Sequence, residues 1–282
     1  MNKFVLFLGL LGMMIFHSCD IVEGPYGTPG GGNIDTTEQV IRKILIEDFT
    51  GHQCGNCPRA AEALKAIEEL YPGQIVPLGI HVGFFAEPSL SGSYTADYRC
   101  ETGNELDQFY GNSAAGLPNG LINRISFDSD PILQYTDWSS KASLLAALPP
   151  DAWIDLNPEY NSASRSLQVN ASVNILTTIE DSLHLALYLS EDSIVSAQKD
   201  YSLTPSTIPA YTHRHVLRGS MNGTYGLPMA AGSTFSPGTT LTASATYSIP
   251  PSWNDTHIHI VAVLLKANSK EVIQAEDVKL NE

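Results

Sequence analysis

Two cysteines three positions apart are the residues of this sequence whose types and spacing point most directly to chemistry. Cys54 and Cys57 stand in the run Cys-Gly-Asn-Cys-Pro, directly ahead of a segment with helical periodicity. Thiols at this spacing can close a small disulfide and open it again by thiol–disulfide exchange. At the start of a helix, backbone N–H groups and the helix dipole favour a thiolate. The motif predicts a redox site or a structural disulfide, and by itself leaves both open.

A zinc site is the other chemistry that these residues allow. His52 would join Cys54 and Cys57 as a third ligand, but a structural zinc site needs a fourth. The sequence holds no second pair of cysteines, and Cys100 is left over as an odd thiol whose partner the sequence does not reveal. The cysteine content therefore favours a dithiol, and no cofactor is predicted.

The elements around the dithiol follow from periodicity. Residues 40–49 are β-branched and apolar, as in a strand that is covered on both faces. After Pro58, apolar residues recur on one helical face until Pro72-Gly73 ends the helix. Residues 74–82 read as the next strand, and residues 136–148 read as a later helix. The dithiol is thus predicted to lie between a buried strand and a helix.

These residues resemble the thioredoxin superfamily. Asp48-Phe49 ends the first strand six residues before Cys54, and Gly116-Leu117-Pro118 precedes a further strand. The resemblance implies that Cys54 attacks, that Cys57 resolves and that Asp48 moves a proton to or from Cys57. It also implies that Pro118 is cis, packs beside the dithiol and shapes the substrate groove.

The sequence also departs from the thioredoxin pattern. Gln53 stands where redox thioredoxins usually carry Trp, and Gly-Asn replaces Gly-Pro between the cysteines. Residues 84–110 form an insertion relative to the minimal fold. These departures leave the redox potential open.

The pattern changes at Pro149-Pro150-Asp151. Beyond this point helical periodicity gives way to alternation, and about seven strands are separated by turn signals. Residues 191–210 look like a long, polar surface excursion. The predicted fold class is therefore an α/β thioredoxin-like N-terminal domain (38–148) followed by an all-β, immunoglobulin-like antiparallel sandwich domain (149–282).

Two His-x-His pairs lie in the second part. His213 and His215, and likewise His257 and His259, would share a face if each pair lies on a strand, and could then chelate a metal. Polar residues at the edges of solvated strands are the simpler interpretation. No metal is predicted, and the four histidines remain weak candidates.

The N-terminus indicates export. Residues 1–18 have a basic start and a short apolar run, as in a signal peptide, and Ser18 precedes Cys19 as in a lipobox. Cys19 is the predicted lipidation site, carrying diacylglycerol and an acyl chain such as palmitate, and residues 19–37 form a Gly- and Pro-rich tether. The net charge of −15 argues against nucleic acid and anionic lipid as partners.

Longer phrases resemble the 28-kilodalton outer-membrane lipoprotein family of Bacteroidetes. They are the tethered Cys19, residues 46–60, residues 116–118 and residues 211–226. The resemblance implies a lipid-anchored protein of the cell outer membrane, with surface or periplasmic exposure left open. Two functions remain. The first is an oxidoreductase that acts on protein dithiols. The second is an adhesin- or receptor-type protein that binds host or cell-surface ligands, with Cys54–Cys57 as a structural disulfide.

Overall fold

The computed structural model describes residues 40–281. The predicted signal segment 1–18, the lipidation site Cys19 and the tether 19–37 lie outside the described residues. From Val40 onward the chain forms one compact unit. Within residues 40–281, no helix is both long enough and apolar enough to span a bilayer.

A strand, a helix and a second strand form the first part of the fold. β1 (Ile44–Thr50) is buried over almost its whole length and pairs in parallel with β2 (Ile75–His81). Its apolar, β-branched run suits a strand that is covered on both faces. α1 (Cys57–Leu70) connects the two strands, and Pro58 lies in its first turn, where a missing N–H costs little.

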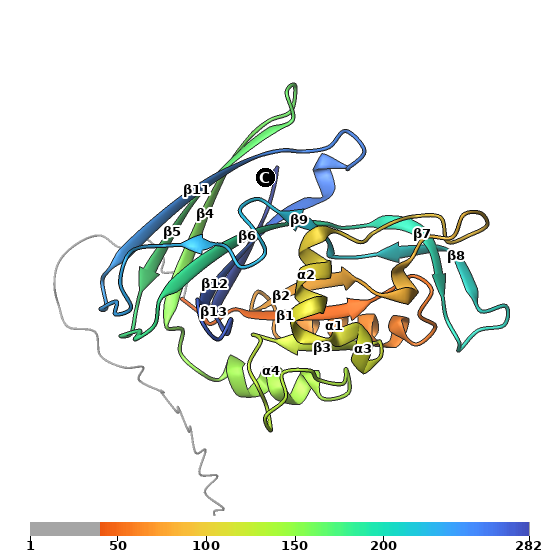
Figure 1. The fold of residues 1–282 in the computed structure, drawn as a ribbon, viewed down its shortest axis with the longest axis horizontal. Helices are drawn as coiled ribbons and strands as arrows, with labels where there is room; N and C mark the ends of the chain where they lie inside the picture. Colours follow the sequence, from red (N-terminus) through yellow and green to blue (C-terminus); the bar gives the residue numbers. More distant parts are fainter. Residues whose placement is uncertain (1–39, 282) are drawn as a thin grey trace, which may run out of the picture. The chain divides into compact units, whose positions relative to one another are not determined.

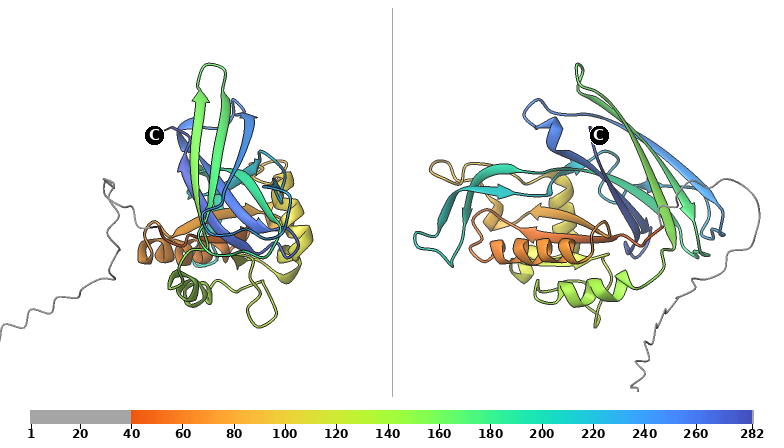
Figure 2. Two further views of the ribbon diagram at one scale, coloured as in Figure 1. Left: turned by 90° about the vertical axis from the view of Figure 1, so that its left-hand side faces the viewer. Right: turned by 180° about the vertical axis from the view of Figure 1, so that it is seen from behind.

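Helices cover both faces of these strands. β3 (Asn119–Ile122) pairs antiparallel with β1. α1 and α4 (Trp138–Ala146) pack on one face, and α2 (Glu101–Tyr110) packs on the other (Figures 1 and 2). Two short helical segments complete this part, η1 (Phe84–Ala86) and α3 (Asn112–Ala115).

The same sheet continues into the second half of the chain. Its order is β13-β12-β6-β9-β2-β1-β3, and the short β10 also pairs with β6. β9 pairs antiparallel with β6 and meets β2 in parallel, where the Gly79 N–H donates to the carbonyl oxygen of His215 at 2.8 Å. The additional strands are β6 (Leu183–Glu191), β9 (Val216–Ser220), β10 (Leu227–Pro228), β12 (Ile258–Lys266) and β13 (Val272–Lys279).

Two smaller antiparallel sheets complete the fold. β4 (Ala152–Asn161), β5 (Ser166–Ile175) and β11 (Thr240–Ser248) form a three-stranded sheet in the order β11-β5-β4. This sheet lies against β6 and β12 (Figure 2). Its alternate apolar residues pack with those of β6 and β12 in one core. β7 (Ile194–Lys199) and β8 (Thr207–His213) form a separate hairpin.

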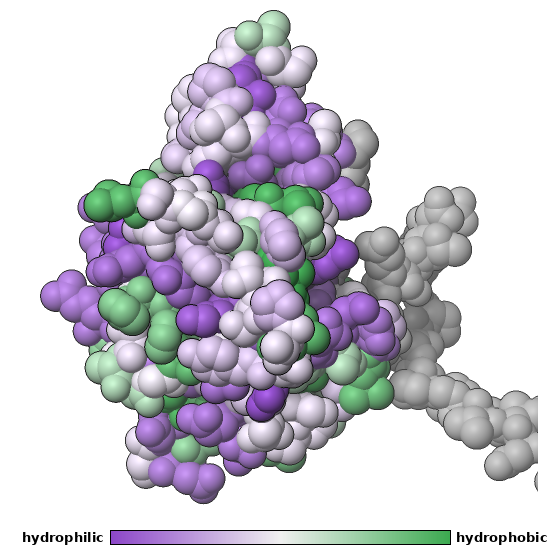
Figure 3. All heavy atoms as spheres, turned by 90° about the vertical axis from the view of Figure 1, so that its right-hand side faces the viewer, coloured by the Kyte–Doolittle hydropathy of each residue, from purple (hydrophilic) through white to green (hydrophobic). Residues whose placement is uncertain are grey.

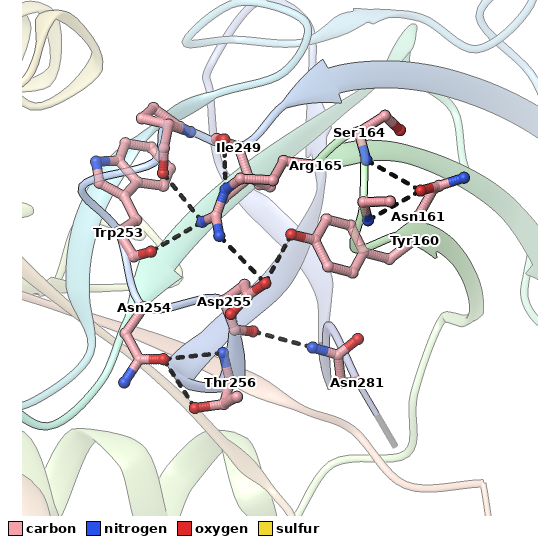
Figure 4. A network of polar contacts seen from close by, with 12 residues as sticks. Tyr160, Asn161, Ser164, Arg165, Ile249, Trp253, Asn254, Asp255, Thr256 and Asn281 are labelled. Atoms are coloured by element: carbon pink, nitrogen blue, oxygen red, sulfur yellow. Dashed lines mark hydrogen bonds and ion pairs between the residues drawn. The ribbon is translucent and has the colours of Figure 1, made fainter.

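Arg165 fastens the turn between β4 and β5 to the segment between β11 and β12. Its guanidinium donates to the carbonyl oxygens of Ile249 (3.1 Å), Pro250 (3.0 Å) and Trp253 (2.8 Å). It also pairs with the Asp255 carboxylate at 3.2 Å (Figure 4). The small sheet is thereby joined to the large one by polar contacts as well as by its apolar face.

A buried ion pair crosses the large sheet. Arg124 follows β3 and donates to both carboxylate oxygens of Glu47 on β1, at 2.9 and 2.7 Å. It also donates to the Tyr188 hydroxyl on β6 at 3.1 Å. The side chains of Glu47 and Arg124 are fully buried. A paired, bidentate contact of this kind satisfies charges that would be costly to bury alone.

The predicted fold class is wrong. The sequence indicated an α/β thioredoxin-like domain followed by a separate immunoglobulin-like sandwich, but β1, β2 and β3 share one sheet with β6, β9, β12 and β13. The N-terminal strands therefore have no sheet of their own. Periodicity describes each strand locally and cannot reveal that Gly79 meets Val216. Residues 149–151 do lie between α4 and β4, where helical segments give way to strands.

Candidate functional site

The dithiol lies where β1 passes into α1. Cys54 and Cys57 form a disulfide, with their Cα atoms 5.4 Å apart. The Cys54 N–H donates to the Gly51 carbonyl oxygen at 2.9 Å, which closes the turn that carries the first cysteine. Cys57 is the first residue of α1, so its sulfur lies at the positive end of the helix dipole. Both cysteines are only 2% exposed.

Asp48 supplies an acid at the same site. It lies on β1, is 4% exposed, and one of its carboxylate oxygens has no hydrogen-bond partner among the described residues. Burial raises the pKa of Asp48 to about 8, because a desolvated carboxylate is disfavoured. Asp48 is therefore largely protonated at neutral pH and can exchange a proton close to neutrality.

Two adjoining cavities meet at Asp48. The smaller has a volume of about 40 Å³ and is lined by Asp48, Cys57 and His81 among others. The larger, of about 270 Å³, lies between α1 and residues 211–215 and is also lined by Asp48. The smaller cavity is large enough to hold a water molecule, which needs at least about 10–15 Å³ of such space. Asp48 thus lies between the disulfide and the larger pocket.

The β7–β8 hairpin lies over the disulfide loop. The Lys199 N–H donates to the His52 carbonyl oxygen at 2.9 Å, and the Tyr201 N–H donates to that of Gly55 at 2.8 Å. The Gln198 side chain donates to the Cys54 carbonyl oxygen at 3.0 Å. These residues fall in the segment that sequence analysis treated as a surface excursion, and nothing in their types indicated a contact with the dithiol.

Three buried histidines surround Tyr98 beside the disulfide. The ring centroids of His81 and His213 lie 5.0 and 5.1 Å from that of Tyr98, and the ring of His52 lies at 6.1 Å. Tyr98 donates to the Ser196 hydroxyl at 2.7 Å, which in turn contacts His213 Nε2 at 3.0 Å. This cluster links the loop before Cys54 to β2 and to the hairpin.

The buried histidines are neutral at physiological pH. Burial, together with the neighbouring His52, lowers the pKa of His213 to about 4. Burial also places the pKa of His81 well below its ordinary value, as does the neighbouring His213. Neither ring nitrogen of His52 or of His81 has a partner among residues 40–281. Of the residues in this cluster, only His52 was placed near the dithiol by the sequence. His81 could have been found from its place at the end of a parallel strand, where site residues gather.

The members of each His-x-His pair lie in different surroundings. His213 is buried on β8, whereas His215 contacts Glu68 of α1 at 3.5 Å. His257 lies in the short segment η2 (Asp255–His257), and His259 on β12 contacts Asp277 at 3.3 Å. Among residues 40–281, no three His, Cys, Asp or Glu side chains are grouped as a metal ion would require.

Pro118 and Cys100 complete the residues singled out by sequence. The Leu117–Pro118 peptide bond is cis, as the resemblance implied, and β3 begins directly after it with Asn119 opposite Phe49 of β1. Pro118 therefore lies at the end of β1 from which the disulfide loop departs. Cys100 is a free thiol at the start of α2, where its sulfur accepts from the Gly103 N–H.

Solved structures with the same fold come from two bacteria. HBP35 of Porphyromonas gingivalis is similar with a TM-score of 0.60 and 13% identity, over 87% of this chain and 77% of that chain. A protein from Agrobacterium tumefaciens is similar with a TM-score of 0.51 and 14% identity, over 86% and 97% of the two chains. Both similarities extend across the N-terminal and C-terminal parts, in agreement with a shared sheet.

A third solved structure is similar over a smaller part of the chain and comes from a named family. A domain of the outer membrane lipoprotein Omp28 from Porphyromonas gingivalis is 23% identical over 46% of this chain and 96% of that chain, with a TM-score of 0.30. No curated protein matches the sequence. Residues 104–282 match the family model described as outer membrane protein Omp28. Because this match covers more than half of the sequence, the chain belongs to the Omp28 family of outer membrane proteins.

Proposed function

We propose that this outer membrane protein carries out thiol–disulfide exchange at Cys54–Cys57, with Asp48 as the proton carrier. One observation carries the proposal: a buried acid with an unpartnered oxygen lines the same small cavity as Cys57. Burying a polar atom without a hydrogen bond is costly, so each such atom calls for an explanation. A purely structural disulfide needs no acid beside it, whereas an exchanging dithiol needs a group that takes and returns a proton.

The steps follow from the placement of the three groups. In the reduced protein the Cys54 thiolate attacks a substrate disulfide, forms a mixed disulfide and releases one substrate sulfur as a thiolate. Asp48, as a carboxylate, takes the proton of the Cys57 thiol. The Cys57 thiolate then attacks the sulfur of Cys54, closes the disulfide and releases the second substrate sulfur. A protein dithiol reverses the sequence and is itself oxidised.

The pKa of Asp48 suits this role. A free thiol has a pKa of about 8.5, and burial raises the pKa of Asp48 to about 8. Proton transfer between groups of similar pKa is close to balanced in either direction, which suits a reaction that must run both ways. In this proposal Pro118 bounds the substrate side of the dithiol, at the end of β1.

We further propose that the protein is held at the membrane through a lipid on Cys19. The proposal is supported by the apolar segment that ends at Cys19 and by membership of an outer membrane family. In cells grown with labelled fatty acid, the label should appear on the native chain and be lost in Cys19→Ser. A label that persists in the variant would rule out this anchor.

A binding protein with a permanent disulfide is the second candidate. It is favoured by the burial of both cysteines, each only 2% exposed beneath the β7–β8 hairpin. In that case the disulfide would stabilise the start of α1, and the protein would act as an adhesin or receptor for cell-surface ligands. The two candidates differ in whether Cys54 ever bonds to another protein.

Trapping of mixed disulfides separates the two candidates. In Cys57→Ser the attacking Cys54 cannot be released, so the protein in its native envelope should form higher-mass adducts that reductant removes. Cys100→Ser belongs in the background, because the remaining thiol could imitate the result and serine keeps a capping oxygen at α2. The matched control is the same protein with Cys54→Ser added, which should form no adduct. A monomer alone in Cys57→Ser would favour the permanent disulfide.

A further inference from the structure

The segment that covers the disulfide is attached in the manner of a bound peptide. Lys199 and Tyr201 are alternate residues, and their N–H groups donate to the His52 and Gly55 carbonyl oxygens at 2.9 and 2.8 Å. Lys199 is the last residue of β7 and Tyr201 lies in the turn that follows it, so two main-chain hydrogen bonds attach the end of β7 to the disulfide loop. The two acceptors flank the first cysteine of the disulfide.

Side chains of the same segment complete the cover. Gln198 is 3% exposed, and its amide donates to the Cys54 carbonyl oxygen at 3.0 Å and to that of Gly51 at 3.4 Å. The Tyr201 ring lies against Gly55 so closely that a methyl group there would come within 2.5 Å of it. Glycine between the two cysteines therefore accommodates an aromatic ring that lies directly over the motif.

We propose that residues 198–201 are a built-in pseudo-substrate, which occupies the groove where an extended, cysteine-containing polypeptide binds to the disulfide. The inference rests on the proposed exchange function and names the substrate class for it. Main-chain hydrogen bonds from an added strand are a general means of binding extended peptides without strict sequence requirement. A substrate strand would take the acceptors on His52 and Gly55 after the segment leaves.

The hairpin is built so that its end can leave while its base stays. At the base, Ser196 on β7 and His213 on β8 are tied to the buried Tyr98. Residues 201–205 at the tip are exposed, and residues 198–201 contact the disulfide loop through a few neutral hydrogen bonds and one ring. Segments with few buried contacts open locally at far lower cost than global unfolding.

The outer surface of this region suits a peptide partner. Figure 3 shows the face at the hairpin end as a mixture of hydrophilic and hydrophobic residues. Exposed apolar side chains around the cover include Phe84, Val195 and Leu203. A mixed surface of this kind supports binding through the main chain, with single apolar contacts from the substrate.

The cover is tested by the rate at which dithiothreitol reduces Cys54–Cys57 in full-length protein carrying Cys100→Ser. Gln198→Ala combined with Tyr201→Ala should accelerate reduction on the order of tenfold, because two or three neutral contacts are lost. Leu203→Ala, an exposed tip residue, is the matched control and should reduce at the native rate. Circular dichroism and unfolding midpoints establish that the variants remain folded. An unchanged rate in the double variant would overturn the proposal.

A peptide then tests the groove itself. A synthetic peptide with the sequence of residues 196–203 should bind the double variant and slow its reduction back toward the native rate. No protection by this peptide, compared with a scrambled peptide, would overturn the assignment of a peptide groove.

Unchanged reduction rates in the double variant, with adducts still trapped by Cys57→Ser, would refute the pseudo-substrate alone. Faster reduction without any adduct would refute the exchange function and leave the groove in place.

Discussion

Asp48 is the residue on which the proposed chemistry depends. It combines burial, an unpartnered oxygen and a position beside two cavities, one of which reaches Cys57. A buried acid of this kind makes folding less favourable at neutral pH, since the unfolded chain holds it as a solvated carboxylate. Groups that lower stability without a structural benefit are typical of functional sites.

Replacing Asp48 with asparagine should remove a pH dependence of stability. The folded pKa of about 8 lies above the ordinary 3.8, so folding takes up a proton between these values. The free energy of unfolding of the native chain should therefore fall as pH rises from about 4 to about 8, by about 1.4 kcal/mol per pH unit for one proton. Asp48→Asn should lack this component and be the more stable protein at pH 8.

Denaturant unfolding at several pH values measures this difference. Asp155→Asn serves as the matched control, because Asp155 is exposed on β4 and should follow the native profile. Parallel profiles for Asp48→Asn and the native chain would mean that Asp48 is already ionised in the folded protein. The proton-carrier role would then lose its physical basis.

Local spacing is enough to predict the residues of the dithiol but not those that cover it. Cys54, Cys57 and Asp48 lie within ten positions of one another. A strand that leads into a helix over so short a segment necessarily brings the three side chains close together. Gln198 of β7 and Tyr201 of the turn after it reach the same place from a distant part of the chain. An ordinary glutamine and tyrosine in a polar stretch carry no signal of that contact.

Among the elements, the β7–β8 hairpin was the hardest to predict. Its strands are short, and residues 200–206 between them are rich in Ser, Thr and Pro, which is typical of a loop. By contrast β5 and β6 have strict or nearly continuous apolar patterns and were predicted correctly as strands. The hairpin is stabilised by tertiary contacts with His52, Gly55 and Tyr98, which propensity does not record.

Arg165 is expected to hold the small sheet to the large one. Arg165→Met keeps the length of the side chain but removes its hydrogen bonds to Ile249, Pro250 and Trp253 and its pairing with Asp255 (Figure 4). We expect a loss of roughly 1–3 kcal/mol in the free energy of unfolding, because partly buried carbonyl oxygens lose their donors.

Arg59→Met is the matched control for this measurement, since it removes the same charge from an exposed position on α1. Its unfolding midpoint in urea should stay close to that of the native chain. Equal midpoints for the two variants would show that the Arg165 contacts contribute nothing beyond a surface charge.

At the scale of the whole molecule, one sheet joins the two parts that the sequence predicts as separate folds. β1 pairs with β2, β2 meets β9, and β9 pairs with β6, so the strands around the dithiol continue directly into the sandwich. The buried Glu47–Arg124 pair and Tyr188 cross the same boundary. The sequence predicts most of these strands, but their order in the sheet depends on contacts between distant residues.

Unfolding should therefore be cooperative across the two parts. Trp138 of α4 lies in the core between α1, α4 and β1, and Trp253 lies in the core of the sandwich. Two variants, one retaining only Trp138 and one only Trp253 of the three tryptophans, should give the same fluorescence midpoint in urea. Midpoints that differ, with a domain-sized fragment from limited proteolysis on either side of residues 149–151, would instead support two independent domains.

The reduction potential of the Cys54–Cys57 pair tests the central claim most directly. It is measured in the Cys100→Ser background by equilibrating the full-length protein with dithiol buffers of known potential and trapping free thiols. An exchanging dithiol should have a potential above about −300 mV, within reach of protein dithiols, whereas structural disulfides typically lie below it. We expect a value above this limit that becomes more negative as pH rises. A value well below it, with the pair staying oxidised in millimolar glutathione, would contradict the exchange function and leave the disulfide as a structural link.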